Sequence, residues 1–115
     1  MIKVYFDRDA QGRIVAFETK GHALYAEPGR DIVCAAVSAL LQNVVVGLKQ
    51  YLGLEIDHQK NKGWMRVSIR GFKGKEKEAA ALLETMALSL RAIAGEERYQ
   101  GYVKVYGSDE RGEFI

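Results

Sequence analysis

The feature of the sequence that most restricts the fold is an apolar helical pattern over residues 32–48. At about 100° per residue, six apolar side chains share one broad face of such a helix; they are Val33, Val37, Leu40, Leu41, Val44 and Leu48. Asp31 precedes the pattern and is a good N-cap residue. The pair at residues 28–29, Pro-Gly, interrupts any earlier regular structure. We therefore expect a helix that begins at Ile32 and buries one face.

Cys34, the only cysteine, falls in the first turn of this helix. Free backbone N–H groups and the positive end of the helix dipole converge there, which favours the nucleophilic thiolate. Cys34 lies at the edge of the apolar face, with Ser38 one turn further along, so we expect its sulfur to be partly accessible. The alternative is a small buried hydrophobe, which is the usual role of a lone cysteine.

His22 precedes Cys34 by twelve residues, which is enough chain to bring the imidazole beside the start of the helix. Such a pair is the minimal activated nucleophile, because the histidine accepts the thiol proton and later protonates the leaving amine. The N–H groups of the first helical turn could form an oxyanion hole. Asp31 could orient His22, although one carboxylate cannot fully cap the helix and fully hold the imidazole. The alternative is a solvated histidine without a chemical role.

Two segments, GHA at residues 21–23 and GRDIVCAAVSAL at residues 29–40, closely resemble the signature of the ribosomal-processing cysteine protease family Prp. The length of the chain and the order of its expected elements also fit that small single-domain family. The resemblance implies that His22 is the acid/base and Cys34 the nucleophile. It also implies supporting roles for Gly21, Asp31 and Ser38.

The same resemblance implies a substrate and an assembly state. Members of the family remove a short N-terminal extension from a protein of the bacterial large ribosomal subunit, after a phenylalanine-containing motif. They form homodimers, with a mobile loop between the histidine and the cysteine. By resemblance, this chain would be a cytoplasmic cysteine endopeptidase that acts on a ribosomal protein precursor.

Residues 23–30 contain apolar side chains without a periodic partner. One interpretation is a loop that packs its own side chains. The other is a lid or recognition surface, in which Leu24 and Tyr25 help to form a pocket for an aromatic side chain of the substrate. The residues alone do not decide between these interpretations, and the resemblance favours the second.

Alternating apolar and polar residues predict strands over residues 2–7, 13–20, 54–60, 64–70 and 99–106. A second helical stripe covers residues 75–94 and stops at Gly95. The order β-β-α-β-β-α-β predicts a single α+β domain over residues 1–115, with two helices on one face of a mainly antiparallel sheet. Within it we expect Val15 to share a face with Phe17, and His58 to be exposed beside a turn.

The first predicted helix also has a second face made of small residues, namely Ala35, Ala36, Ala39, Asn43 and Gly47. A helix can bury two faces only if a further element packs on it. Either the second helix or a second copy of the chain could cover this face.

The composition restricts the other possibilities. A formal net charge of +2 gives no argument for a nucleic-acid partner, so we do not expect direct contact with nucleic acid. A single cysteine excludes an internal disulfide and suits a reducing cytoplasm. The sequence begins without an apolar signal-peptide core, and polar residues interrupt the apolar helix, so we interpret it as a core helix and not a membrane span.

No spacing of cysteines or histidines suggests a metal, and no glycine-rich motif suggests a phosphate cradle, so we expect no cofactor. Basic residues do gather around the second predicted hairpin: Lys60, Lys62, Arg66, Arg70, Lys73, Lys75 and Lys77. A solvated rim explains them, and an RNA-facing patch is the alternative. The second functional hypothesis is accordingly a non-enzymatic module that binds a ribosomal protein or rRNA with this patch.

Overall fold

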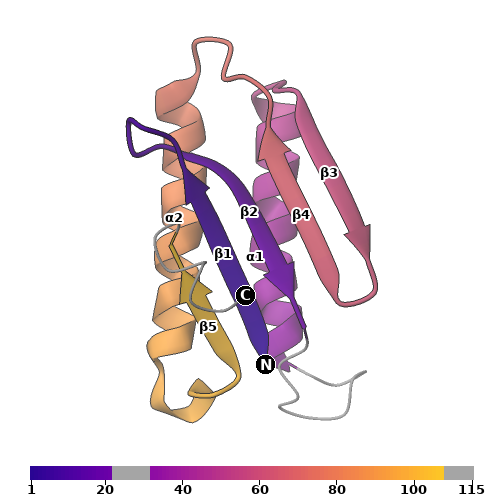
Figure 1. Cartoon of the computed structure of the whole chain (residues 1–115), viewed down its shortest axis with the longest axis vertical. Helices are drawn as coiled ribbons and strands as arrows, with labels where there is room; N and C mark the ends of the chain where they lie inside the picture. Colours follow the sequence, from indigo (N-terminus) through magenta and orange to yellow (C-terminus); the bar gives the residue numbers. More distant parts are fainter. Residues whose placement is uncertain (22–31, 108–115) are drawn as a thin grey trace.

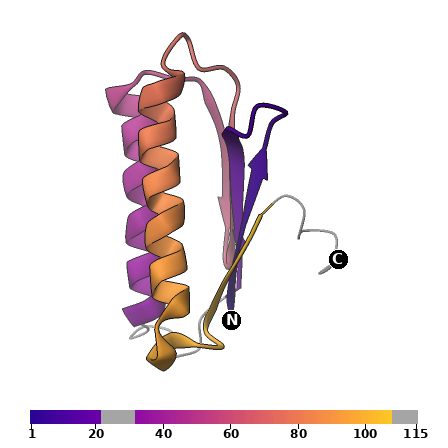
Figure 2. The ribbon, with the colours of Figure 1, turned by 90° about the vertical axis from the view of Figure 1, so that its left-hand side faces the viewer.

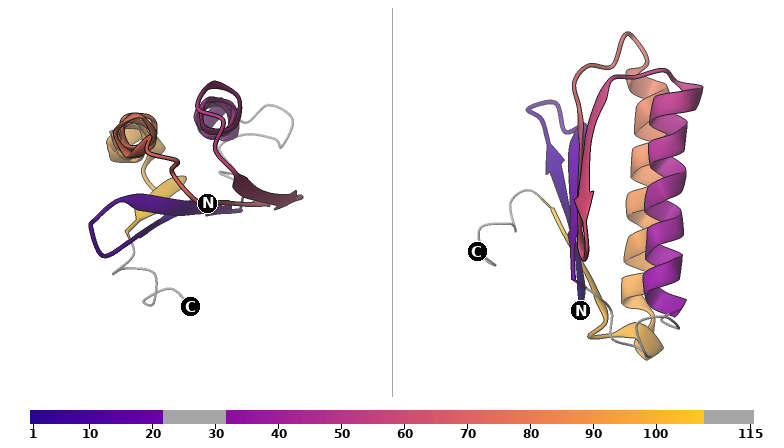
Figure 3. Two further views of the ribbon diagram at one scale, coloured as in Figure 1. Left: turned by 90° about the horizontal axis from the view of Figure 1, so that it is seen from above. Right: turned by 90° about the vertical axis from the view of Figure 1, so that its right-hand side faces the viewer.

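A computed structural model of the chain describes residues 1–21 and 32–107. They form two layers, a five-stranded sheet and a pair of helices that both cover one face of it (Figures 1, 2 and 3). In chain order the elements are β1 (Ile2–Arg8), β2 (Ile14–Lys20), α1 (Ile32–Val46), the π-helical turn η2 (Gly47–Tyr51), β3 (Ile56–Asn61), β4 (Trp64–Ile69), α2 (Glu76–Gly95), the 3-10 turn η3 (Glu97–Tyr99) and β5 (Val103–Tyr106). The predicted fold class and element order are confirmed.

The strands lie in the order β3-β4-β2-β1-β5. All neighbours are antiparallel except β1 and β5, which run parallel, with Ile2 opposite Val103. On the face toward the helices, Val4 pairs with Thr19 and Phe6 with Phe17. The remaining face of the sheet, which neither helix covers, is called the open face below.

The predicted side-chain alternation of β2 is wrong at its start. Asp7 pairs with Ala16 and Arg8 with Ile14, so Val15 is an extra residue in β2 that opposes no residue of β1. Such a bulge shifts the alternation by one position. Ile14, and not Val15, therefore joins Phe17 in the hydrophobic core.

The last predicted strand is also shorter than expected. Residues 97–102 form η3 and a following turn, in which the Tyr102 N–H donates to the Tyr99 carbonyl at 3.0 Å. Gly101 has a φ of 87°, which glycine adopts without strain. The strand can start only after this turn, at Val103.

One face of α1 packs onto the sheet through five fully or nearly buried side chains, Val33, Val37, Leu41, Val44 and Val45. Directly after α1, Gly47 of η2 meets α2, since a Cβ there would lie 2.9 Å from a methyl carbon of Leu82. Glycine thus lets the two helices approach closely. The other small residues of the second face, Ala35, Ala36, Ala39 and Asn43, are exposed, so α2 covers only one end of that face.

By length and composition alone, the continuous helix over Ile32–Tyr51 could cross a membrane, with a mean hydropathy of 1.8. The core helix of a globular domain meets the same criterion. Its buried side chains belong to the hydrophobic cluster shared with the sheet, which supports the predicted core helix.

Candidate active site

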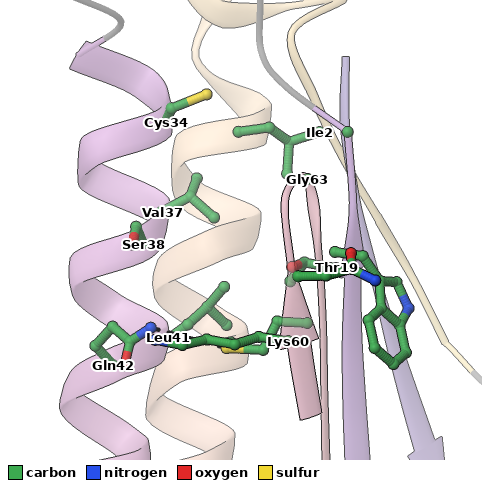
Figure 4. Close-up of a pocket in the computed structure, with 13 residues that line it drawn as sticks. Ile2, Thr19, Cys34, Val37, Ser38, Leu41, Gln42, Lys60 and Gly63 are labelled. Atoms are coloured by element: carbon green, nitrogen blue, oxygen red, sulfur yellow. Dashed lines mark hydrogen bonds between the residues drawn. The ribbon is translucent and has the colours of Figure 1, made fainter. Parts of the chain in front are cut away.

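A cleft of about 290 Å³ separates the first half of α1 from one end of the sheet (Figure 4). Its helix wall consists of Cys34, Val37, Ser38, Leu41 and Gln42, and its other wall comes from the strands and turns around Ile2, Thr19, Gly21, Lys60, Asn61, Gly63, Trp64 and Met65. Of these residues, the sequence predicts only Cys34, Ser38 and Gly21 as members of a site. The others come together because β4 pairs with β2.

Cys34 lies in the first turn of α1, partly exposed and packed against the edge of the core. In Figure 4 its sulfur points away from the helix axis toward the side of the cleft that carries Ile2. The side chain is thus neither sealed among aliphatic residues nor fully solvated. The start of a helix favours a negatively charged group at this position, which suits a thiolate nucleophile.

The cleft continues from Cys34 along the helix. Ser38 and Gln42 follow at intervals of one turn on the same wall, and the Gln42 amide contacts the Met65 sulfur at 3.8 Å. Between these polar groups the cleft has an apolar lining that includes Val37, Leu41 and Met65. A nucleophile beside a groove that is partly lined by apolar side chains is suited to an extended peptide that inserts an apolar side chain.

Gly21 directly follows β2 and lines this cleft. Its φ is 90°, and a Cβ at this position would overlap the Met1 carbonyl oxygen. Its N–H donates to the Gly63 carbonyl at 2.8 Å, which ties the end of β2 to the β3–β4 turn. These constraints give Gly21 a structural reason to be glycine and fix the point from which the next segment departs.

Four of the predicted site residues lie outside the described residues: His22, Leu24, Tyr25 and Asp31. Their roles, and the contact between His22 and Cys34, therefore stay predictions. The structure describes Gly21, Cys34 and Ser38 and brings all three to the same cleft.

His58, the other histidine, is not the solvent-exposed side chain that the sequence analysis expects. It lies opposite Val67 on the helix-facing side of the sheet and is only partly exposed. Its Nε2 atom is buried and has no hydrogen-bond partner among the described residues. Burial lowers the pKa of His58 below 6.5, and the nearby charges of Lys60 and Lys49 lower it further. His58 is absent from the residues that line the cleft, so it does not rival His22 as the base.

This position predicts a stability change with pH. Above about pH 7, His58 is neutral in both the folded and the unfolded chain. As the pH falls below 6.5, the unfolded chain gains a proton on His58 more readily than the folded protein does, because the folded-state pKa is lowered. His58 therefore costs the folded protein stability at acidic pH. His58→Leu should stabilise the fold by about 1 kcal/mol, since it removes a buried nitrogen without a partner. Urea unfolding should show a larger gain near pH 5.5 than near pH 7.5. An equal gain at both values would contradict the assignment.

The basic residues of the second hairpin do not form one patch. Arg66 pairs with Asp7 at 3.2 Å and with Glu18 at 3.4 Å, and Arg70 pairs with Asp57 at 2.7 Å. The Nζ atoms of two lysines instead donate to backbone carbonyl groups, Lys73 to Gly53 and Lys75 to Leu52. These contacts favour a structural interpretation of the cluster over an RNA-facing patch. Within residues 1–21 and 32–107, no cluster of histidine, cysteine and carboxylate side chains is arranged to hold a metal ion.

Comparison with known proteins gives a consistent result. Residues 1–104 match the family model described as cysteine protease Prp. The chain is 33% identical over 108 residues to the ribosomal processing cysteine protease Prp of Staphylococcus aureus (strain Mu50), covering 91% of this chain and 97% of that one. It is 31% identical over 109 residues to the Bacillus subtilis protein of the same name, covering 91% and 96%.

Solved structures agree. The S. aureus protease Prp with a covalently linked product peptide superposes with a TM-score of 0.83 at 27% identity, over 94% of this chain and 100% of that one. The same protease with a substrate peptide gives a TM-score of 0.79 at 26% identity, with the same coverage. From the fold, the cleft beside Cys34 and these matches together, we conclude that the chain belongs to the cysteine protease Prp family.

Proposed function

We propose that this protein is the cytoplasmic endopeptidase that removes the N-terminal extension of a bacterial large-subunit ribosomal protein, without a cofactor. The observation that carries the proposal is the position of Cys34, at the start of α1 and on the wall of a cleft that is partly lined by apolar side chains. The names of the relatives, which specify ribosomal processing, and their peptide-bound structures support the choice of substrate.

In the proposed reaction His22 accepts the proton of Cys34, and the sulfur attacks the scissile carbonyl carbon. Backbone N–H groups in the first turn of α1 are the donors for the oxyanion of the tetrahedral intermediate. His22 then protonates the leaving amine as the C–N bond breaks. Water, deprotonated by His22, attacks the thioester and releases the carboxylate product and the free thiol.

The remaining predicted residues have supporting roles in this proposal. Asp31 precedes α1 and would cap it or orient His22. Ser38 lines the cleft one turn from Cys34 and would contact the bound peptide. Leu24 and Tyr25 would contribute to the pocket for an aromatic substrate side chain.

The direct test is mass spectrometry of a purified ribosomal protein precursor after incubation with the chain and with its Cys34→Ala form. A single cleavage near the N-terminus that requires Cys34 is the expected result. Cleavage by both forms, or binding of an uncut precursor by both, would favour the non-enzymatic module instead.

We further propose that the protein is a homodimer that joins through the exposed side of α1. Along this side Ile32 and Val46 are 57% and 50% exposed, and three small residues between them, Ala35, Ala36 and Ala39, are exposed as well. Small side chains let two helices pack closely, and a two-fold axis would bury the same surface of each copy.

Ala39→Glu should therefore convert the dimer to a monomer, because it places two carboxylates together at the centre of the interface. Sedimentation velocity over a range of concentrations measures the change. Gln11→Glu, which adds the same charge in the β1–β2 turn, is the control and should stay dimeric. A dimer that persists in Ala39→Glu would contradict the choice of surface.

A further inference from the structure

Three lysines from distant parts of the sequence lie side by side on the open face of the sheet. Lys3 pairs directly with Lys20 across β1 and β2, and with Lys104 across β1 and β5. Neighbouring strands are about 4.8 Å apart, so the three side chains leave the sheet from adjacent positions of one row. The Lys20 ammonium group lies over the Tyr5 ring, 5.7 Å from its centroid. We call Lys3, Lys20 and Lys104 the lysine row.

Among the described residues, only Lys20 of the row lies within ion-pair distance of a carboxylate. The paired position beyond Lys20 is Trp64 and the next is Asn61, so no carboxylate stands in the row among the described residues. Glu18 lies 4.0 Å from the Lys20 ammonium group and is almost buried. Glu18 also accepts from the Trp64 indole N–H at 2.6 Å and from Arg66 at 3.4 Å, so its charge is not available to Lys20 alone.

Like charges at directly paired positions of a sheet destabilise it. Two such pairs in succession therefore reduce the stability of the free protein, and neither Lys3 nor Lys104 makes an ion pair with any described residue. A bound polyanion would remove this repulsion. The formal net charge of +2 conceals the row, because carboxylates elsewhere cancel it in the sum.

Trp64 indicates which class of polyanion suits the lysine row. Its indole is partly exposed on the same row, and the hydrogen bond to Glu18 holds the ring in position beside Lys20. The combination of cations with an aromatic ring on an open sheet face is suited to single-stranded nucleic acid, in which phosphates meet the cations and a base stacks on the ring. An acidic peptide offers the charges but no base to stack.

We propose that the lysine row and Trp64 form a binding surface for single-stranded RNA. The surface adjoins the cleft and shares Trp64 with it, since Trp64 lines the cleft, and Ile2 and Gly21, which also line it, each precede or follow a lysine of the row. The three lysines themselves do not line the cleft, so RNA bound to the row would leave the helix wall beside Cys34 uncovered. This inference does not depend on the proposed protease reaction.

The test is fluorescence anisotropy with a labelled single-stranded RNA of about 12 nucleotides. If the three lysines each contact a phosphate, raising the salt concentration from about 50 to about 200 mM should weaken RNA binding roughly 20-fold. Each such contact on a single strand adds about 0.7 to the slope of the logarithm of affinity against the logarithm of salt concentration. Replacement of the whole row by glutamine should lower the slope by about 2. The fluorescence of Trp64, the only tryptophan, should be quenched by RNA.

The control removes three exposed cations from the helix side of the molecule, by Lys49→Gln, Lys77→Gln and Arg91→Gln together. It changes the net charge equally and should retain most of the affinity and all of the quenching. Equal losses in the two triple variants would overturn the proposal, because they would indicate a response to net charge alone. Poly-glutamate that binds as tightly as RNA would overturn it in favour of an acidic protein partner. Thermal unfolding of each variant checks the fold independently of protease activity.

Discussion

Cys34→Ser should abolish processing of the precursor while its fold and its affinity for the substrate peptide persist. A serine hydroxyl is not ionised at neutral pH, and the start of α1 cannot make it a comparable nucleophile. Loss of a catalytic nucleophile lowers kcat by roughly 10⁴-fold or more. Single-turnover cleavage of a peptide that spans the scissile bond measures the loss, and fluorescence binding with the same peptide measures the retained affinity.

Two further variants make this experiment decisive. Ala92→Ser adds a hydroxyl at an exposed position of α2 that does not line the cleft, and should cleave at the wild-type rate. His22→Ala should lose activity to a degree comparable with Cys34→Ser, since the two residues act as one unit. If Cys34→Ser and His22→Ala each process the precursor normally, the proposed pair is wrong.

Gly21→Ala should have the second largest effect, although Gly21 has no side chain to offer the reaction. An alanine with a φ of 90° costs about 1–2 kcal/mol, and its Cβ would also overlap the Met1 carbonyl oxygen. The end of β2 must then move, and it carries the segment that contains His22. A displacement of this kind can lower kcat/KM by roughly 100-fold. Urea unfolding and peptide cleavage measure the two consequences.

The chain supplies a matched control for this substitution. Gly12 has a similar φ of 82°, but a Cβ there would meet no atom within 4 Å. Gly12→Ala should therefore lose only the backbone contribution and cleave the peptide normally. If both variants lose the same stability and retain activity, the contact with Met1 does not position the site.

The predictable part of the fold is the part that local periodicity encodes. Both helices follow from their apolar stripes, and the start of α1 at Ile32 follows from the residues around it. Alternation cannot state which strands become neighbours, so the parallel pairing of β1 with β5 emerges only from the structure. Nor can it reveal Val15 as an extra residue, since a bulge depends on the register of two strands.

The same division applies to the site. Cys34 and Ser38 could be identified from the sequence because one helix holds both. The opposite wall of the cleft could not, since it depends on β4 pairing with β2 and not with β1. The lysine row is even harder to predict from the sequence than this wall. Its members are separated by 17 and 84 positions in the sequence and become neighbours only across three strands.

The parallel contact between β1 and β5 has a consequence for synthesis of the protein. Ile2 lines the cleft, and its N–H donates to the carbonyl of Tyr102 at 2.8 Å, beside the last described strand. Contacts over so great a separation form late, because a long loop must close first. While β5 is still inside the ribosomal exit tunnel, the wall of the cleft that contains Ile2 is therefore not yet fixed. We expect the nascent chain to gain peptidase activity only after β5 has left the ribosome.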